Sequence, residues 1–274
     1  MVSGATARSA RSAVIFFRLL WLHLKLGLLN ELQYRANLAI QLAESLLSLV
    51  GALVGFAFVF SKTETLAGWR PAELLTIVGV YFLVGGITRV VVQPSLARFM
   101  EDIRLGTLDF ALTKPVDAQV LASVRQVEIW KGIDVFLGAG VLAVALTQLG
   151  FAGGFLGALR FLVALLAGIV IIYSFLLILA TCSFWFVRLQ NIFVIFQSMY
   201  EAGRWPIGIY PPWLRTTLTF LVPVGFAITV PAEGLTGRLS WASLVGAIAL
   251  AIALPLIARR FWLFGIRHYS GASA

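Results

Sequence analysis

The chain has 274 residues, of which 60% are hydrophobic and 12% are charged, and its mean hydropathy is +0.96. A soluble domain normally carries about a quarter charged residues, so this composition excludes a soluble cytosolic enzyme and predicts an all-α polytopic membrane protein. The net charge of +9 fits basic loops beside an anionic leaflet and gives no support for nucleic acid as a partner.

Residues 1–37 are predicted to form a cytoplasmic amphipathic helix on the membrane surface. Arg11, Arg18 and Lys25 recur every seven positions and share one helix face, while apolar residues cover much of the rest. The basic residues interrupt the apolar run, which a signal peptide would keep continuous.

Residues 38–268 are predicted to form a domain of six transmembrane helices, with a flexible tail at 269–274. A span needs about 20 mostly apolar residues, and five runs satisfy this requirement: Leu38–Phe60, Leu74–Val92, Gly132–Leu149, Leu159–Thr181 and Ala242–Ala258. The basic N-terminal segment and the basic tail predict that both termini are cytoplasmic. The number of crossings must then be even, so the proline-rich stretch between Arg188 and Arg238 must supply one.

Polar residues gather on one side of the first span. Gln41, Glu44, Ser45 and Ser48 occupy neighbouring helix positions. A carboxylate at membrane depth costs about 2.5–3.5 kcal/mol unless it has a partner. Glu44 therefore either lies in a translocation path, where it attracts a cationic substrate, or pairs with Arg89 of the second span. The two serines equally fit a seam of close helix packing.

The segment 93–131 is the least apolar part of the chain and is predicted to lie in the cytoplasm. Ser95 is expected to cap a short helix that Gly106 ends in the left-handed conformation, and Leu108–Leu112 forms a second short helix that Pro115 stops. The first helix would have one apolar side (Leu96, Phe99, Ile103, Leu105) and one exposed charged side (Arg98, Glu101, Asp102, Arg104). This pattern fits a docking surface, and it fits equally a solvated loop whose apolar residues pack on the membrane.

The motifs of common catalytic sites are missing from the sequence. It contains no H-E-x-x-H zinc motif, no G-x-S-x-G nucleophile elbow and no G-x-x-x-x-G-K-[ST] phosphate loop. No Asp, Glu, His or Cys residues cluster at the spacing of metal ligands. We therefore expect no enzyme activity, no metal and no cofactor in this chain, and any ATP hydrolysis would belong to another subunit.

The string RLGTLDFALTKPV resembles a motif of type 2 ABC exporter permeases, the membrane subunits of bacterial ABC transporters. The matching positions are Arg104, Gly106, Thr107, Leu108, Asp109, Leu112, Lys114, Pro115 and Val116, with Lys114 standing where threonine is common. In that family the loop docks in a groove of the ATPase subunit. The resemblance therefore implies coupling roles for Glu101, Asp102, Arg104, Leu105, Gly106, Leu108, Asp109, Phe110, Lys114 and Pro115.

A second stretch, GRWPIGIYPPWLRTTLTFLVPVGFAITVPAEGL, resembles the proline-rich outer segment of the same family. That likeness implies a short fifth span at Phe184–Gly203, followed by re-entrant outer helices over residues 204–233. The residues assigned to these helices are Trp205, Pro206, Tyr210, Pro211, Pro212, Trp213 and Pro223. The competing assignment makes Thr216–Ala232 the fifth span and leaves residues 190–215 inside.

The resemblance implies the permease subunit of an ATP-driven exporter in the bacterial inner membrane. It would act with a second permease copy or paralogue and with ATPase subunits that bind ATP and Mg. The strings QYRANLAI, GWRPAEL and RHYSGA resemble paired permeases of drug or antibiotic efflux, which implies a small amphipathic substrate. The alternative is a secondary transporter or channel that uses Glu44 as a proton or cation site, although the paired halves common in secondary transporters are not evident.

Overall fold

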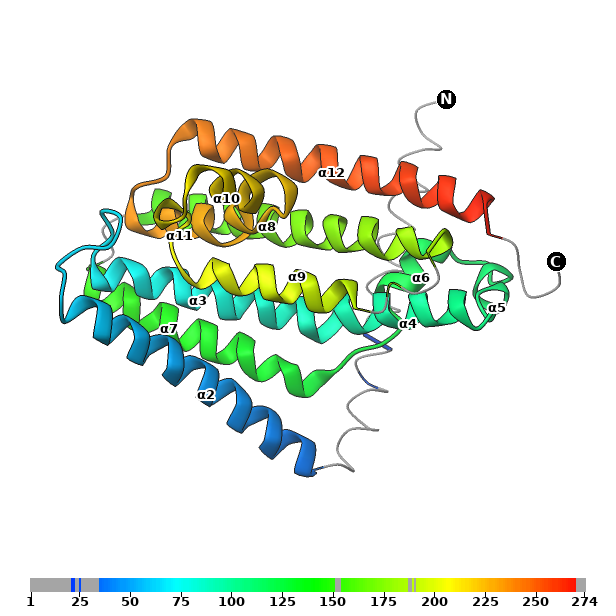
Figure 1. The fold of residues 1–274 in the computed structure, drawn as a ribbon, viewed down its shortest axis with the longest axis horizontal. Coiled ribbons are helices and arrows are strands. Elements are labelled where there is room, and N and C mark those ends of the chain that lie inside the picture. The colour runs from blue at the N-terminus through cyan, green and yellow to red at the C-terminus, as the bar shows by residue number, and fades with distance from the viewer. Residues whose placement is uncertain are drawn as a thin grey trace.

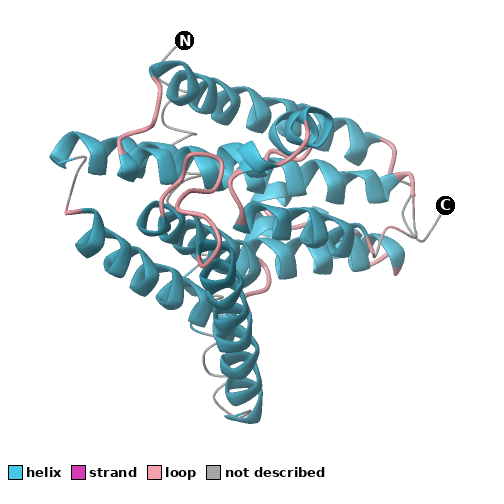
Figure 2. Ribbon diagram, turned by 60° about the vertical axis from the view of Figure 1, so that its left-hand side comes forward, coloured by secondary structure: helices cyan, strands magenta, loops and turns pink. Residues whose placement is uncertain are grey.

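The computed structural model describes residues 35–150, 154–186, 189 and 191–269, together with positions 21, 22 and 25. Every regular element in this part of the chain is helical, as Figure 2 shows, apart from one isolated bridge between Leu66 and Trp69. The all-α prediction is confirmed for the described residues. The predicted interfacial helix over residues 1–37 and the tail after Tyr269 lie almost wholly outside them.

Five helical stretches are long and apolar enough to cross a membrane, and a bent helix pair raises the number to six if it counts as one span. The chain is therefore a multi-pass membrane protein. The main helices are α2 (Arg35–Phe60), α3 (Pro71–Ile87), α7 (Ile133–Leu149), α8 (Gly154–Thr181) and α12 (Trp241–Arg267).

The second span continues without a break into the segment that the sequence assigned to a loop. After α3 come a π-helical turn, η1 (Thr88–Val92), and α4 (Gln93–Arg104), and the three form a rod of 34 residues. At 1.5 Å per residue the rod is about 50 Å long, whereas the hydrocarbon core is about 30 Å thick. One end of the rod, with its charged residues, therefore extends beyond the membrane.

Two local features explain why Pro94 and Ser95 do not start a new helix. A proline lacks the N–H that would bond the carbonyl four residues earlier, and the freed carbonyl of Val90 accepts instead from the backbone N–H of Glu128 at 2.9 Å. The prediction that Ser95 caps a short helix is wrong. Ser95 is buried inside the rod, where its hydroxyl donates to the Gln126 carbonyl at 2.7 Å and accepts from the Gln126 N–H at 3.1 Å.

The span that contains α3 is the most buried of the spans; α7 packs along α3, and α12 packs on α8. In Figure 1, α4 lies near α5 (Asp109–Leu112) and α6 (Ala118–Val124), at the end of the molecule where α12 finishes. We call this end the loop end (residues 93–131). The opposite end, where the 61–70 turn joins α2 to α3 and where α12 begins, is called the hairpin end. A short 3-10 turn, η2 (Ile129–Gly132), leads from the loop end into α7.

The α3–α7 contact depends on glycines that allow the two backbones to touch. A Cβ atom on Gly138 would lie 2.6 Å from the Leu83 nitrogen and 2.7 Å from the Gly79 oxygen, both backbone atoms that a rotamer change cannot move. The two helices would have to separate to admit a methyl group at Gly138.

We therefore expect Gly138→Ala to destabilise the protein by about 2 kcal/mol, in the range measured for overpacked cores. Gly140→Ala is the matched control on the same helix, because no atom lies within 4 Å of the Cβ it would add, and alanine favours a helix by about 1 kcal/mol over glycine. Thermal unfolding of both variants in detergent checks this. Equal melting temperatures would contradict the assigned contact.

The proline-rich stretch forms a hairpin of short helices that begins and ends beside the same turn. The elements after α8 are η3 (Cys182–Phe184), α9 (Ile192–Glu201), η4 (Ala202–Arg204), η5 (Ile207–Ile209), α10 (Pro212–Thr216), η6 (Thr217–Leu221), η7 (Gly225–Thr229) and α11 (Val230–Thr236). The chain bends by 77° between η6 and η7. A Cβ on Gly208 would lie 3.6 Å from the Ala67 Cβ, and Arg238 donates to the Gly68 carbonyl at 2.6 Å. Residues 205–238, the proline-rich hairpin, therefore leave the hairpin end and return to it.

The predicted fifth span at Phe184–Gly203 is much shorter than expected. Its α-helical part, α9, has ten residues and rises only about 15 Å, half of a membrane core. Phe184 ends the 3-10 turn η3, and the described residues between it and α9 (Trp185, Phe186, Leu189 and Asn191) are not helical. The competing span, Thr216–Ala232, is interrupted by the 77° bend at Pro223.

Candidate functional site

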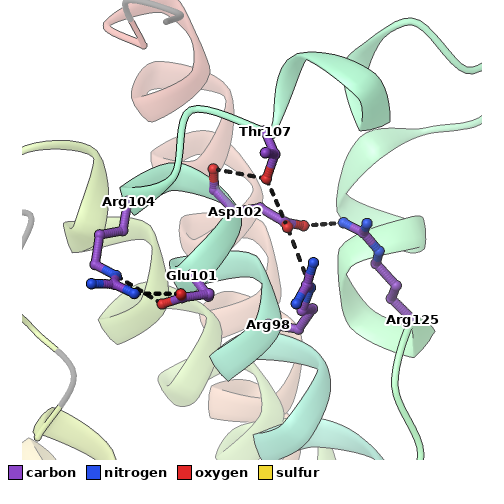
Figure 3. Close-up of polar contacts among 6 residues, drawn as sticks. All are labelled: Arg98, Glu101, Asp102, Arg104, Thr107 and Arg125. Atoms are coloured by element: carbon purple, nitrogen blue, oxygen red, sulfur yellow. Dashed lines mark hydrogen bonds and ion pairs between the residues drawn. The ribbon is translucent and has the colours of Figure 1, made fainter.

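A buried carboxylate, Asp102, holds the loop end together (Figure 3). It forms ion pairs with Arg98 on the same helix, at 3.3 Å, and with Arg125 beyond the end of α6. The Thr107 hydroxyl donates to an Asp102 carboxylate oxygen at 3.0 Å, and the Thr107 N–H donates to the Asp102 carbonyl at 2.9 Å. One side chain thus joins α4, the turn after it and α6.

This geometry corrects the prediction that Asp102 lies on the exposed side of the helix. Its side chain is 1% exposed, because the arginines and Thr107 surround it. Leu108 is buried as well, so neither residue can touch another protein directly. Gly106 does end α4 as expected, with φ of 69°, the left-handed conformation that glycine adopts without steric cost.

Two large apolar side chains extend outward from this end of the molecule. Phe110, on the short helix α5, is 74% exposed, and Leu105, at the end of α4, is 53% exposed. The exposed Arg104 precedes Leu105 and pairs with the partly buried Glu101 at 2.5 Å. We call Leu105 and Phe110 the apolar knob. The other predicted coupling residues divide by burial: Lys114 and Pro115 are exposed, and Asp109 is partly buried at the start of α5.

The loop end is tied to the last span by a pair that the sequence did not reveal. Asp117 caps α6 by accepting from the Gln119 and Val120 N–H groups, at 2.9 and 3.4 Å. The same carboxylate binds Arg259 of α12 through two hydrogen bonds, of 2.5 and 3.0 Å. Nearby, Trp262 of α12 packs against Phe99 of α4 at 4.6 Å between ring centroids.

The Asp117 contact predicts a pH dependence at the loop end. Partial burial alone would raise the pKa of Asp117, but the Arg259 guanidinium and the two backbone N–H groups outweigh burial and hold its pKa below the ordinary value. A carboxyl with a lowered folded-state pKa stabilises the fold above its unfolded-state pKa, about 3.9 for aspartate. That contribution is lost as pH falls through the lower, folded-state pKa.

We therefore expect amide protection of α6 against hydrogen exchange, corrected for intrinsic rates, to be constant above pH about 5 and to fall in more acidic solution. Asp117→Asn should lower this protection already at neutral pH and remove the acid-dependent step. Hydrogen exchange read by mass spectrometry measures both. An unchanged acid-dependent step in Asp117→Asn would assign the titration to another group.

Three of the five predicted translocation residues, Gln41, Glu44 and Arg89, line a polar cleft between α2 and α9. The cleft has a volume of about 550 Å³. Gln41 and Glu44 of α2, Arg89 of η1, and Gln197 and Glu201 of α9 are among the residues that line it. Ser45 is buried and accepts a hydrogen bond from Gln41 at 3.2 Å. Ser48 accepts from Arg204 at 2.9 Å. The two serines hold neighbouring groups in place and do not line the cleft.

The alternative that Glu44 pairs with Arg89 is wrong. Arg89 forms its ion pair with Asp134 in the first turn of α7, at 2.8 Å, and Asp134 is 1% exposed. The arginine sits in the π-helical turn η1, and its Nε also donates to the Gly85 carbonyl at 3.3 Å. Such π turns occur often at functional sites. Asp134 could have been found from the sequence, because it is an acidic residue within a predicted span.

The residues predicted for the outer helices all lie in the proline-rich hairpin. Trp205 packs edge-on against Phe56 of α2 at 4.5 Å between ring centroids. The Tyr210 hydroxyl donates to the Ala202 carbonyl at 2.9 Å. Pro206, Pro211 and Pro223 lie between the short helices, Pro212 is the first residue of α10, and Trp213 is 69% exposed. The hairpin is thus a packed structure held against α2 and α9.

Within the described residues, no group of three or more His, Cys, Asp or Glu side chains is placed to hold a metal ion. The candidate functional features are the exposed apolar knob at the loop end, the polar cleft beside α2 and α9, and the Asp117–Arg259 ion pair that connects the loop end to α12.

Comparison with protein families finds a match over most of the chain. The family described as ABC-2 family transporter protein matches residues 46–273. The search of curated proteins finds no match to the chain. The matched range includes the loop end, α9 and the proline-rich hairpin, and it begins two residues after Glu44. Because this range covers most of the chain, the protein belongs to the ABC-2 family of transporter proteins and is a membrane subunit of an ABC transporter.

Proposed function

We propose that this chain is the permease subunit of an ATP-driven exporter in the bacterial cytoplasmic membrane, with both termini in the cytoplasm. Family membership implies association with ABC ATPase subunits. In the proposed assembly, two such subunits bind ATP and Mg, and a second permease, either a copy or a paralogue, completes the translocation path. The exported molecules are small and amphipathic.

The observation that carries the proposal is the apolar knob. Phe110 is 74% exposed at the end of a rod too long for the membrane, and the buried Asp102 network fixes its position. Aromatic side chains that fill a partner's pocket contribute strongly to binding. We place this knob in the cytoplasm, in contact with an ATPase subunit.

The geometry of the rod supports a coupling mechanism. Because α3, η1 and α4 form one continuous helix, force on the loop end acts directly on the second span. The Asp117–Arg259 pair would carry the same force to α12. The proline-rich hairpin begins and ends at the hairpin end of the molecule, opposite the loop end. This supports its assignment as a re-entrant structure at the outer face. In this assignment, α9 and the segment before it form the fifth crossing.

Purification from the native membrane in mild detergent tests the proposal. We expect a P-loop ATPase to co-purify, and we expect transport in inverted vesicles to require ATP and to survive collapse of the proton gradient. Transport that persists without ATP and stops when the proton gradient is removed would instead establish the secondary transporter with Glu44 as its cation site.

Charge reversal at Asp109 is expected to uncouple the assembly. Asp109 is the first residue of α5, directly before Phe110, so a lysine there would alter the charge that faces the ATPase subunit. For Asp109→Lys we expect membrane insertion and ATP hydrolysis to continue and export to fall at least tenfold. Parallel assays of ATPase activity and vesicle transport measure this. Normal export would remove Asp109 from the docking surface.

A further inference from the structure

The cleft between α2 and α9 is open beside Glu44 and closed toward the hairpin end. Arg204, just after α9, donates to Ser48 at 2.9 Å and lies over the Tyr81 ring at 4.9 Å. Trp205 packs on Phe56 beyond it. The segment that directly follows α9 therefore contacts α2 in the half near the hairpin end. In the other half a space of about 550 Å³ separates α2 from α9, a size that suits a drug-sized ligand.

The charges that line this cleft do not balance. Its two basic residues are neutralised by carboxylates outside the lining: Arg89 pairs with Asp134 at 2.8 Å, and Lys131 pairs with Glu128 at 2.6 Å. Its two acidic residues, Glu44 and Glu201, have neither an ion pair nor a side-chain hydrogen bond with any other residue of the described part. Both glutamates are exposed. Arg204, which closes the cleft beside Glu201 and has no ion pair within the described residues, offsets one of the two negative charges, so the cleft and its closed end together carry a net charge of about −1.

An uncompensated carboxylate near membrane depth costs about 2.5–3.5 kcal/mol on insertion scales, so a cation that enters the cleft removes part of an existing penalty. The remaining walls determine what kind of cation fits. Gln41 and Gln197 offer amide groups, while Phe193 and Val194 provide an apolar side. An aromatic ring also attracts cations through its face.

We propose that this cleft is the substrate site and that it selects small organic cations with an apolar body, held by Glu44 and Glu201. This proposal rests on the proposed function, because it takes α2 and α9 as walls of the translocation path. Glu44 lies in the open half of the cleft. Glu201 lies next to the closing contact of Arg204 and marks the end of the cleft that faces the hairpin end. Of these two carboxylates, the sequence predicts only Glu44 as a residue of the path.

The test uses the permease together with its ATPase subunits in lipid nanodiscs and ethidium, a permanently charged aromatic cation, as the probe. We expect saturable binding, seen as fluorescence anisotropy. Glu44→Gln and Glu201→Gln should each raise the Kd for ethidium about tenfold, the change that corresponds to about 1.4 kcal/mol. Glu44→Asp, which keeps the charge, should bind within about threefold of the unaltered protein.

Glu64→Gln is the matched control, because Glu64 is exposed in the 61–70 turn, away from the cleft, and its Kd should not change. Monodisperse elution of every variant separates loss of binding from loss of folding. Absence of ethidium binding to the unaltered complex, or equal affinities for all variants, would overturn the proposal. If the complex hydrolyses ATP but does not bind ethidium, only the cation site fails. If ethidium binds as expected but no ATPase subunit associates, the exporter assignment fails and the cation site remains.

Discussion

Asp102→Asn is expected to loosen the whole loop end while leaving the transmembrane helices folded. The substitution keeps the shape of the side chain but removes the buried negative charge that binds Arg98 and Arg125. Hydrogen bonds to charged groups contribute about 1.5–3 kcal/mol each. Both arginines are partly exposed and can be rehydrated, so we expect a loss of about 2 kcal/mol of local stability, within that range.

Hydrogen exchange measures this effect. A local loss of about 2 kcal/mol corresponds to amide exchange about 30-fold faster, and we expect it over residues 105–125 but not in α7 or α8. Glu101→Gln provides the control, because Glu101 makes only an exposed ion pair with Arg104, at 2.5 Å, and exposed pairs contribute little. Faster exchange in Glu101→Gln than in Asp102→Asn would contradict the central position of Asp102.

Phe110→Ala is expected to weaken binding of the ATPase subunit without destabilising the permease. Phe110 is 74% exposed, so its removal leaves no cavity in the protein. Truncation of a central aromatic residue in an interface commonly costs at least about 2 kcal/mol, which corresponds to a Kd raised about 30-fold. Titration of the ATPase subunit onto the permease in nanodiscs measures this change.

Trp213→Ala is the control for Phe110→Ala. Trp213 is similarly exposed, at 69%, but it lies in the proline-rich hairpin at the other end of the molecule. We expect unchanged affinity for the ATPase subunit in this variant. If Trp213→Ala weakened binding and Phe110→Ala did not, the docking surface would have to be moved to the hairpin end.

Hydropathy alone predicted the five long spans, because each is a continuous apolar run that must satisfy its backbone hydrogen bonds within a helix. The 205–238 stretch was harder to predict. Its prolines showed that the helix must break, but only the contacts of Gly208 with Ala67 and of Arg238 with Gly68 reveal that both ends of the stretch return to the same turn.

The candidate sites were predicted less completely, since burial and partners depend on tertiary contacts. Periodicity placed Asp102 among the charged residues of an amphipathic helix, and it is buried because Arg125, 23 residues later, and Thr107 enclose it. The Asp117–Arg259 pair spans 142 residues, a separation that no local pattern reports. Helix continuity through Pro94 likewise depends on a distant partner: the Glu128 N–H donates to the Val90 carbonyl that Pro94 leaves free. The local sequence around Pro94 does not reveal this partner.

Site-specific photo-crosslinking tests the central claim, that the loop end docks the ATPase subunit. The photoreactive substitution Phe110→p-benzoylphenylalanine is compared with Trp213→p-benzoylphenylalanine in native membranes. Our account predicts an adduct between the permease and a P-loop ATPase from position 110 and none from position 213. An ATPase adduct from position 213 alone, or from neither position in a complex that hydrolyses ATP, would contradict it.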